Sequence, residues 1–215
     1  MFSPDLWNKS AADDAYTIDN SCRFDDGDAA YLSRTFSAVG NRRAWTLSFW
    51  FKQGNIQGAT TGQRWLSPAS NSQGNMQLYN SKLWFSPSST GALLTTTRVF
   101  RDPGSWYHVV GVWDSDNAAS GDRIRLYING ERETAFDTAT YPSQYTDSSH
   151  INTAVLHYIS TYNGSDEPID GYLAEYYFID GQALAADSFA ETDEDTNQWI
   201  PKDAVDDLTF GTNGF

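Results

Sequence analysis

The feature that most constrains the fold is a period of two in the hydrophobic residues of AWTLSFWFK, residues 44–52. Four large apolar side chains share one face of an extended chain in this segment: Trp45, Leu47, Phe49 and Phe51. Successive side chains of a β-strand point to opposite faces. The pattern therefore predicts a strand with one face in a hydrophobic core.

Two later segments extend this prediction. WYHVVGVWD, residues 106–114, is apolar on both faces, which favours a central strand covered on both sides. Its β-branched and aromatic residues disfavour a helix. In RIRLYINGE, residues 123–131, alternating apolar residues lead into Asn129-Gly130. Asn-Gly supplies the positive φ angles of a type I′ turn, so a hairpin is predicted.

The remaining segments complete an all-β pattern. GYLAEYYFIDG, residues 171–181, predicts a strand that is largely apolar on both faces, so we expect Glu175 to be partly buried. Strict alternation places Tyr172, Ala174, Tyr176 and Phe178 on one face and Leu173, Glu175, Tyr177 and Ile179 on the other. Further short strands are expected at SCRF, AYLSRTF, MQLYN, KLWFS and VLHYIS. The segment ALAADSFAE supports one short helix near 184–191. Loops are expected near 53–75, 114–122 and 137–153. The fold class predicted is an antiparallel two-sheet β-sandwich of the jelly-roll type.

Length and composition favour one domain held by packing alone. We expect a single domain over 1–215, with the acidic segment 197–215 as an irregular tail or the lead into a further strand. Aromatic residues make up 15% of the chain, so large rings must supply much of the buried surface. The single Cys22 excludes an internal disulfide, and we expect it to be a small buried residue in a strand.

The charge of the chain argues against nucleic acid as a partner. The formal net charge is −14 and the isoelectric point is near 4.3, so a phosphate backbone would be repelled. No segment approaches the ~20 consecutive apolar residues that cross a bilayer, which predicts no membrane insertion. The first residues lack the pattern of an export signal, so we expect a cytoplasmic protein, a mature form or a viral component.

An ordered set of motifs resembles a known family. RFDDGDAAYLSRTF, WTLSFWFK, WYHVV, LYINGE and DGYLAEYYFIDGQAL follow one another in the order of the laminin G-like jelly roll of the concanavalin A-like lectin and glucanase superfamily, over residues 16–190. YTIDNSCRF, FRDPGSWYH, ATYPSQ and ETDEDTNQWIPK are similar to lectin-like domains in tail and structural proteins of bacteriophages, especially marine ones.

The resemblance implies a setting and a function. It implies a non-catalytic, lectin-like module in a virion, on a phage tail or surface appendage, and otherwise an extracellular module. The partner it implies is a host cell-surface glycan or a neighbouring virion protein. The alternative is a structural domain with no ligand of its own, assembled as a homotrimer through flanking segments.

An enzyme is disfavoured. Glucanases of the superfamily carry Glu-x-Asp-x-x-Glu on one strand, and the nearest match, residues 191–196, ends in Thr196 and reads as a solvated acidic loop. The three histidines, His108, His150 and His157, stand in no nucleophile-elbow or metalloprotease motif. A glycoside hydrolase is therefore the weakest of the three readings, and no catalytic residue is predicted.

Calcium is the one candidate cofactor, because it binds carboxylate and carbonyl oxygens gathered by loops. The alternative is that these carboxylates are solvated turn residues and that no cofactor is bound. The segment FDDGD resembles the opening motif of laminin G-like domains, and Glu175 matches a later acidic element of the family, whereas Ala174 stands where relatives often carry an acid. The predicted ligands are Asp25, Asp26, Asp28, Asp170 and Glu175.

Sugar binding needs exposed aromatic rings that stack on pyranose faces beside groups that hydrogen-bond to hydroxyls. Loop aromatics with polar neighbours are the candidates, together with one amide: Trp65, Tyr79, Trp84, Tyr141, Tyr145, Tyr162 and Asn163. Four other tryptophans are assigned to packing: Trp45, Trp50, Trp106 and Trp113.

Overall fold

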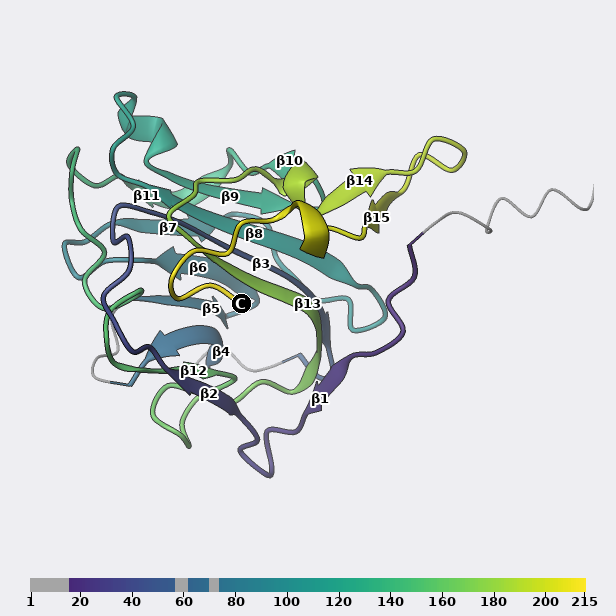
Figure 1. The fold of residues 1–215 in the computed structure, drawn as a ribbon. Helices are drawn as coiled ribbons and strands as arrows, with labels where there is room; N and C mark the ends of the chain where they lie inside the picture. The colour runs from purple at the N-terminus through teal and green to yellow at the C-terminus, as the bar shows by residue number, and fades with distance from the viewer. Residues whose placement is uncertain (1–15, 57–61, 70–73) are drawn as a thin grey trace, which may run out of the picture.

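The computed structural model describes residues 16–56, 62–69 and 74–215, and it confirms the predicted β-sandwich. Two large antiparallel sheets lie face to face (Figure 1). Within the described residues, helix occurs only as short 3-10 turns. The helix expected near 184–191 is one such turn, Ala186–Ser188, which a short strand follows.

The first sheet has six strands in the order β1, β13, β3, β8, β9, β10. Their bounds are Cys22–Phe24, Gly171–Asp180, Ala44–Gln53, Tyr107–Asp114, Ile124–Ile128 and Glu131–Arg132. The predicted hairpin joins the last two strands, and Asn129 and Gly130 have the required φ angles of 49° and 83°.

The second sheet has seven strands in the order β11, β7, β6, β5, β4, β12, β2. Their bounds are Phe136–Thr140, Leu93–Thr96, Lys82–Ser86, Asn75–Tyr79, Gly62–Pro68, Leu156–Ile159 and Leu32–Thr35. Two of these strands, β4 and β11, lie in segments that the sequence predicts to be loops. That prediction was wrong because both strands are rich in polar residues and lack a clear apolar alternation.

The core between the sheets is built largely from aromatic rings. The four inward residues predicted for β3 are all buried there. Phe49 and Phe51 of β3 approach Trp65 of β4, with ring centroids 5.2 and 4.6 Å apart. Rings from opposite sheets therefore interlock and fix the sheet spacing.

Strand β13 contains a bulge that changes which residues face the core. Its pairing with β3 shifts register between Ala174 and Tyr177, and Glu175 has a φ of 46°. Leu173 and Phe178 consequently face the same core, although strict alternation would place them on opposite faces. The predicted faces are wrong beyond Ala174 because a bulge adds one residue to the strand.

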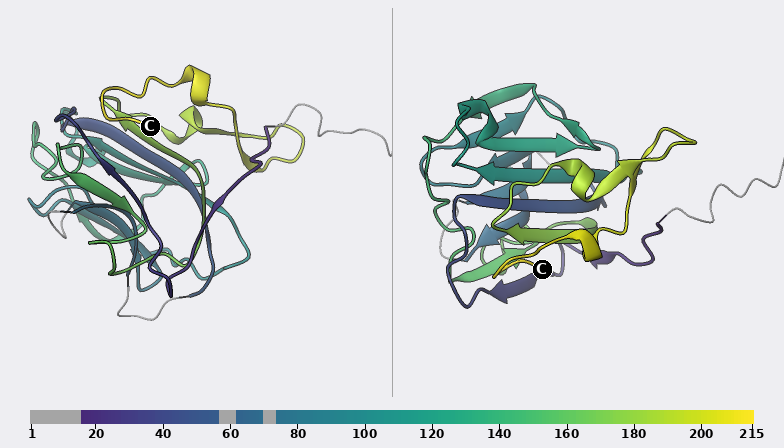
Figure 2. Two further views of the ribbon diagram at one scale, coloured as in Figure 1. Left: turned by 60° about the horizontal axis from the view of Figure 1, so that its bottom comes forward. Right: turned by 45° about the horizontal axis from the view of Figure 1, so that its top comes forward.

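The C-terminal segment covers part of the outer face of the six-stranded sheet (Figure 2). It contains the hairpin of β14 (Ala190–Thr192) and β15 (Trp199–Pro201), and the segment 197–215 has little other regular structure. Phe215 exchanges two backbone hydrogen bonds with Phe178, of 2.9 and 3.0 Å. Its ring stacks on Tyr176 with centroids 6.1 Å apart.

A buried polar cluster also holds this segment. The Asp180 carboxylate accepts hydrogen bonds from the backbone nitrogens of Asn41 (2.7 Å) and Asn213 (3.1 Å) and from the Asn152 amide (2.6 Å). A Cβ on Gly40 would lie 2.3 Å from the Asp180 and Asn152 side chains, so only glycine fits this close approach.

Cys22 lies in β1 as predicted, but it is exposed, so the prediction that it is buried was wrong. Strand β1 is at the edge of its sheet and has a neighbour on one side alone. A residue on an edge strand can remain in solvent even where its sheet is otherwise covered.

Two histidines are buried and hydrogen-bonded in the fold. His108 Nε2 donates to Ser48 Oγ (2.9 Å), and its Nδ1 accepts from Trp199 Nε1 (3.0 Å). His157 Nδ1 donates to the Val155 carbonyl (2.9 Å). Burial lowers the pKa of His108 to about 3 and the pKa of His157 to about 4.

These histidines predict a loss of stability in acid. The folded protein keeps both rings neutral, whereas in the unfolded chain each ring binds a proton below pH ~6.5. The free energy of unfolding should therefore fall as the pH drops from about 6.5 toward 4, by about 1.4 kcal/mol per pH unit for each histidine.

His157→Asn keeps a donor toward Val155 and removes the titrating ring. Urea unfolding at pH 7.0 and 5.5 should show a smaller loss of stability in this variant than in the wild type. Equal losses of stability in the two proteins would show that protonation of His157 does not cause the loss in acid.

The packing of Phe215 gives a second stability prediction. Because its ring is half-buried against Tyr176 and Phe178, Phe215→Ala should lower the free energy of unfolding by about 2 kcal/mol. Val205→Ala, which shortens an exposed side chain of the same segment, is the control and should change little. Denaturant unfolding measures both, and equal small effects would show that the Phe215 ring does not stabilise the fold.

Candidate functional site

The outer face of the seven-stranded sheet carries a row of polar and aromatic side chains. In β6, Leu83 and Phe85 enter the core, so Trp84 between them points outward. Trp84 lies opposite Gln77 of β5, and Gln77 lies opposite Arg64 of β4. Three neighbouring strands thus place these side chains side by side.

Tyr79 and Lys82 extend this row by a second pair on the same face, since they lie opposite each other in β5 and β6. The rings of Tyr79 and Trp84 meet edge to face, with centroids 5.2 Å apart. Both rings are partly exposed. We call this surface, formed by Arg64, Gln77, Tyr79, Lys82 and Trp84, the Trp84 face.

Arg64 is held in place at one end of the row. Its side chain is buried, pairs with the Glu167 carboxylate and lies 4.9 Å from the centroid of the Tyr162 ring. The segment 160–167 lies alongside β4 and is held there by two backbone hydrogen bonds, from Arg64 to Glu167 (3.0 Å) and from Ser160 to Arg64 (2.9 Å). The guanidinium is therefore fixed before any ligand arrives.

Gln77 lies at the centre of the row and is 7% exposed. Its Oε1 has no hydrogen-bond partner within the described part of the chain. A buried carbonyl oxygen normally accepts a hydrogen bond. Because this oxygen has no exposed surface, Gln77 can accept a hydrogen bond from a ligand hydroxyl at this face only if its side chain turns outward.

The carboxylates at this face are paired with cations. Glu167 pairs with Arg64, and Asp137 of β11 pairs with Lys82. The face combines two aromatic rings, fixed donors and an acceptor, with its charges balanced locally. Such a surface can stack on a flat apolar ligand face and hydrogen-bond to the ligand's edge.

The structure corrects one predicted sugar-binding residue. Trp65 is fully buried in the core, and no ligand at the surface can reach it. Trp65 follows outward-facing Arg64 in β4, so alternation along the strand turns its ring inward, whereas the sequence places this segment in a loop. Tyr79, Trp84 and Tyr162 instead lie on or beside the Trp84 face.

Asn163 serves the loop that carries Tyr162. Its Oδ1 accepts hydrogen bonds from Ser165 (backbone, 3.1 Å; hydroxyl, 2.9 Å) and from the Asp166 nitrogen (3.0 Å). Its amide donates to Asp166 Oδ2 (2.8 Å). These bonds use the side chain to shape the turn.

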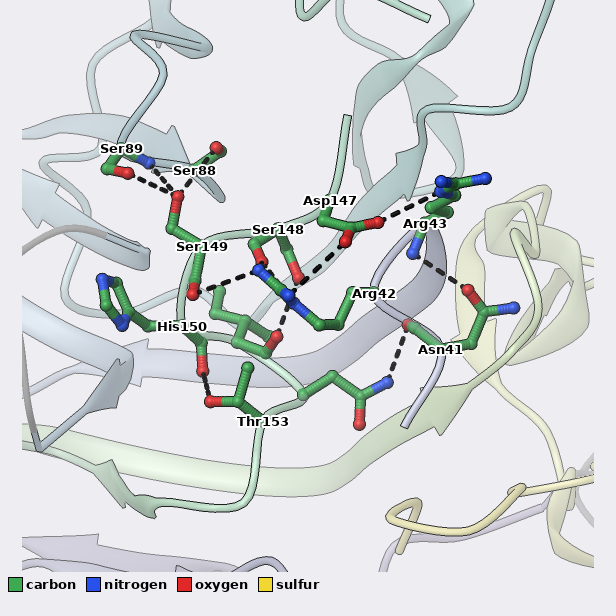
Figure 3. Close-up of polar contacts among 12 residues, drawn as sticks. Asn41, Arg42, Arg43, Ser88, Ser89, Asp147, Ser148, Ser149, His150 and Thr153 are labelled. Atoms are coloured by element: carbon green, nitrogen blue, oxygen red, sulfur yellow. Dashed lines mark hydrogen bonds and ion pairs between the residues drawn. The ribbon is translucent and has the colours of Figure 1, made fainter. Parts of the chain in front are cut away.

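Tyr145 lies in a different place, two residues before Asp147 on a loop that Arg42 and Arg43 hold at Asp147 and Ser148 (Figure 3). Arg42 donates to the Ser148 carbonyl through Nε (2.8 Å) and Nη2 (2.5 Å), and Arg43 Nε pairs with Asp147 (3.1 Å). Tyr145 is 58% exposed, has a φ of 64° and lies 5.7 Å from the Arg43 guanidinium. Its backbone conformation is uncommon for a large residue.

Tyr141 lines a separate pocket of about 200 Å³ at the edge between β9–β10 and β11, with Arg125, Arg132 and Glu133. The structure thus gathers part of the predicted set at the Trp84 face. It places Tyr141 and Tyr145 among other elements.

The predicted calcium ligands are held by other partners. Arg23 lies 2.7 Å from Asp170 and 3.8 Å from Asp25, so one guanidinium links two of them. Glu175 accepts hydrogen bonds from the hydroxyls of Tyr16 and Tyr177.

The other two aspartates are Asp26, whose carboxylate accepts from the Asn55 amide at 3.3 Å, and Asp28, which is exposed. Within residues 16–56, 62–69 and 74–215, no three His, Cys, Asp or Glu side chains converge as a metal site. The five predicted ligands do not fit calcium in this arrangement, and calcium binding stays a prediction from the resemblance.

The acidic segment 191–196 is a turn at the surface. Asp193 Oδ1 accepts hydrogen bonds from the nitrogens of Asp195 (3.1 Å) and Thr196 (2.6 Å) and from the Thr196 hydroxyl (2.6 Å). Hydrogen bonds from Thr196 lower the pKa of Asp193. The carboxylate shapes the hairpin between β14 and β15.

Sequence reasoning missed Arg64, Gln77, Lys82 and Glu167. Alternation in MQLY and KLWF predicts that Gln77 and Lys82 point outward. That these residues and Arg64 form one row is shown only by the pairing of β4, β5 and β6. Trp106 was also misassigned to packing. It precedes β8, which begins at Tyr107, and it is 38% exposed.

Comparison with known families identifies the fold. A family model of laminin G type, described as the concanavalin A-like lectin/glucanases superfamily, matches residues 25–188. No curated protein matches the chain. No helix among the described residues is long and apolar enough to cross a membrane.

Three solved structures share the fold at low sequence identity. A Bacteroides ovatus protein, provisionally assigned carbohydrate binding, has a TM-score of 0.55 and 15% identity over 79% of this chain and 45% of its own. Domains LG4-5 of the mouse laminin α1 chain have a TM-score of 0.53 and 13% identity over 86% of this chain and 46% of theirs.

The third structure is the full-length tailspike protein 2 of Escherichia coli O157:H7 bacteriophage CAB120. It has a TM-score of 0.53 and 16% identity over 80% of this chain and 24% of its own. The chain therefore spans less than half the length of each of these three proteins.

Proposed function

The chain belongs to the laminin G-like family of the concanavalin A-like lectin/glucanase superfamily, and from this premise we propose that it is a non-catalytic carbohydrate-binding module. The Trp84 face is the proposed binding surface. The observation that carries the proposal is the fixed row of Arg64, Gln77 and Trp84, with the Tyr79 ring 5.2 Å from the indole.

The chemistry of the face suits a sugar. A pyranose has one flatter face of C–H groups and a rim of hydroxyls, so it needs a ring beneath it and hydrogen-bonding groups around it. Trp84 and Tyr79 supply the rings, Gln77 supplies an acceptor, and Arg64 and Lys82 supply donors. Because both cations have carboxylate partners, the recognition is by shape and hydrogen bonds.

The proposed setting is a virion tail or surface appendage, where the ligand is a host cell-surface glycan. The sequence similarity to phage structural proteins supports this setting, and the fold shared with a phage tailspike agrees with it. The alternative is a domain that binds a neighbouring virion protein, assembled as a homotrimer in a longer chain. A provisional assignment of carbohydrate binding to the Bacteroides ovatus structure supports the glycan.

Trp84→Ala should weaken glycan binding at this face about two- to tenfold, since stacking on an aromatic ring contributes about 0.5–1.5 kcal/mol. An array of neutral and acidic glycans first identifies a retained glycan, and titration calorimetry then compares the variants on it. Trp84→Phe retains a ring and should lose less affinity than Trp84→Ala.

Val39→Ser changes an exposed apolar residue and is the surface control. Retention of no glycan by the wild type, or equal affinities for wild type and Trp84→Ala, would contradict the proposed face.

Calcium binding is a separate proposal, and Arg23 gives it a test. Calcium could draw Asp25 and Asp170 together only if it displaced the Arg23 guanidinium, so Arg23→Gln should bind calcium more tightly than the wild type. Thermal unfolding with calcium, with magnesium and with chelator measures the binding. An unfolding temperature that calcium leaves unchanged in both proteins would exclude a site at these residues.

A further inference from the structure

A pocket with aromatic walls lies on the sheet opposite the Trp84 face. It has a volume of about 380 Å³ and sits on the outer face of the six-stranded sheet, beside the hairpin of β14 and β15. Its lining comes from five parts of the chain: residues 16–21, Trp50, Trp106, Ala174 and Pro201. We call it the Trp106 pocket.

The floor of this pocket is rigid. Trp50 of β3 and Ala174 of β13 lie opposite each other and form it. The Trp50 ring stacks on buried His108, with centroids 4.9 Å apart, and His108 is itself hydrogen-bonded to Ser48 and Trp199. Because His108 packs against one face of the Trp50 ring, the ring is held in place for a ligand on its other face.

The rim of the pocket carries exposed aromatic rings. Trp106 is 38% exposed and Tyr172 is 36% exposed, and their ring centroids lie 6.4 Å apart. Lys52 lies opposite Tyr172 in the sheet, and the Arg23 guanidinium stacks 5.3 Å from the Tyr172 ring. Two exposed rings in contact beside a pocket form an apolar patch, and such patches commonly mark binding sites.

The wall of the pocket is anchored to the bulge in β13. Tyr16 donates a hydrogen bond to Glu175 Oε1 (3.1 Å), and Ile18 packs against the cluster of Trp50, Ala174 and Ala190. Burial, together with the Glu175 carboxylate, raises the pKa of Tyr16, so its hydroxyl remains a donor. The left-handed φ of Glu175 aims its carboxylate at this wall.

The polar groups of the pocket come from the same wall. Residues 17–21 contribute the side chains of Thr17, Asp19, Asn20 and Ser21 at its edge. The pocket therefore has an indole floor, an indole at the rim and an edge of hydroxyl, amide and carboxylate groups. Its volume is that of one or two sugar rings and is too small for a folded partner.

We propose that the Trp106 pocket is a second carbohydrate site, which takes one or two rings of a neutral saccharide. The net charge of −14 and the Asp19 carboxylate at the edge select against a polyanionic sugar. The proposal rests on the proposed carbohydrate specificity of the chain, but it does not depend on the Trp84 face.

The two sites differ in position and therefore in consequence. One lies on the outer face of each sheet, so they point away from each other on opposite sides of the sandwich. A single glycan chain cannot lie flat on both, whereas two chains can be held at once. The domain would thus cross-link polysaccharide, and its avidity for a glycan surface would exceed the affinity of either site.

The experiment uses the full chain and four proteins: wild type, Trp84→Ala, Trp106→Ala and the double variant. The single variants are matched controls, because each removes one outward indole from one sheet. Neutral oligosaccharides of two to six residues, released from a neutral polysaccharide that the wild type retains, are titrated by calorimetry. Two sites are expected for the wild type, one for each single variant and none for the double variant.

The outcomes separate this proposal from the Trp84 face. If Trp106→Ala loses a site and Trp84→Ala does not, the Trp106 pocket stands and the Trp84 face fails. If the wild type has one site and Trp106→Ala binds as tightly as the wild type, the Trp106 pocket is overturned. Precipitation of the intact polysaccharide gives an independent readout, since only a protein with two sites can cross-link it.

Two further measurements guard against a variant that misfolds. Hydrogen exchange of the unmodified protein should show residues 16–21 protected when saturating oligosaccharide is added. Tyr16→Phe removes the bond to Glu175 and keeps the ring, so it should weaken this site about three- to tenfold and leave the other unchanged. Unchanged exchange at 16–21 together with unchanged affinity of Tyr16→Phe would also overturn the proposal.

Discussion

The packing of aromatic rings between the two sheets is the interaction on which the rest of the structure depends. One cysteine cannot form an internal disulfide, so the sandwich closes through contacts such as those of Phe49 and Phe51 with Trp65. Because successive side chains of a strand point to opposite faces, a residue that packs in the core places its two neighbours on the outer face. Trp84 faces solvent because Leu83 and Phe85 face the core, so the outer surfaces are a consequence of the inner packing.

Local pattern predicted those parts of the fold that depend on neighbouring residues. The core face of β3 and the turn at Asn129-Gly130 could be predicted because each depends only on residues within one strand or one hairpin. Strand β4 could not be predicted, because Gln63 and Arg64 interrupt the alternation of apolar residues. The Trp84 face could be predicted only in part, because Arg64 and Gln77 are brought beside Trp84 by pairing between strands that are distant in sequence.

The two sequence errors about direction have different causes. Trp65 was expected at the surface because β4 was predicted to be a loop, and once β4 is a strand, alternation after outward-facing Arg64 turns Trp65 inward. The faces of β13 reverse beyond Ala174 because a bulge adds a residue to the strand, and hydrophobicity alone does not reveal a bulge. This second feature also borders a proposed site, since it places Glu175 beside the wall of the Trp106 pocket.

The balance of charge explains why two sites would be useful. Arg64 and Lys82 at one face and Arg23 at the other each lie beside a carboxylate, so these three cations attract an anionic sugar only weakly. Recognition must then come from stacking and from hydrogen bonds between neutral groups. Because these hydrogen bonds only replace those that the sugar makes with water, the net affinity of one site is small. A surface covered with repeating glycan compensates for this weakness, because a second site binds at the effective concentration set by the first. Weak sites on opposite faces therefore favour attachment to dense polysaccharide over capture of a free sugar.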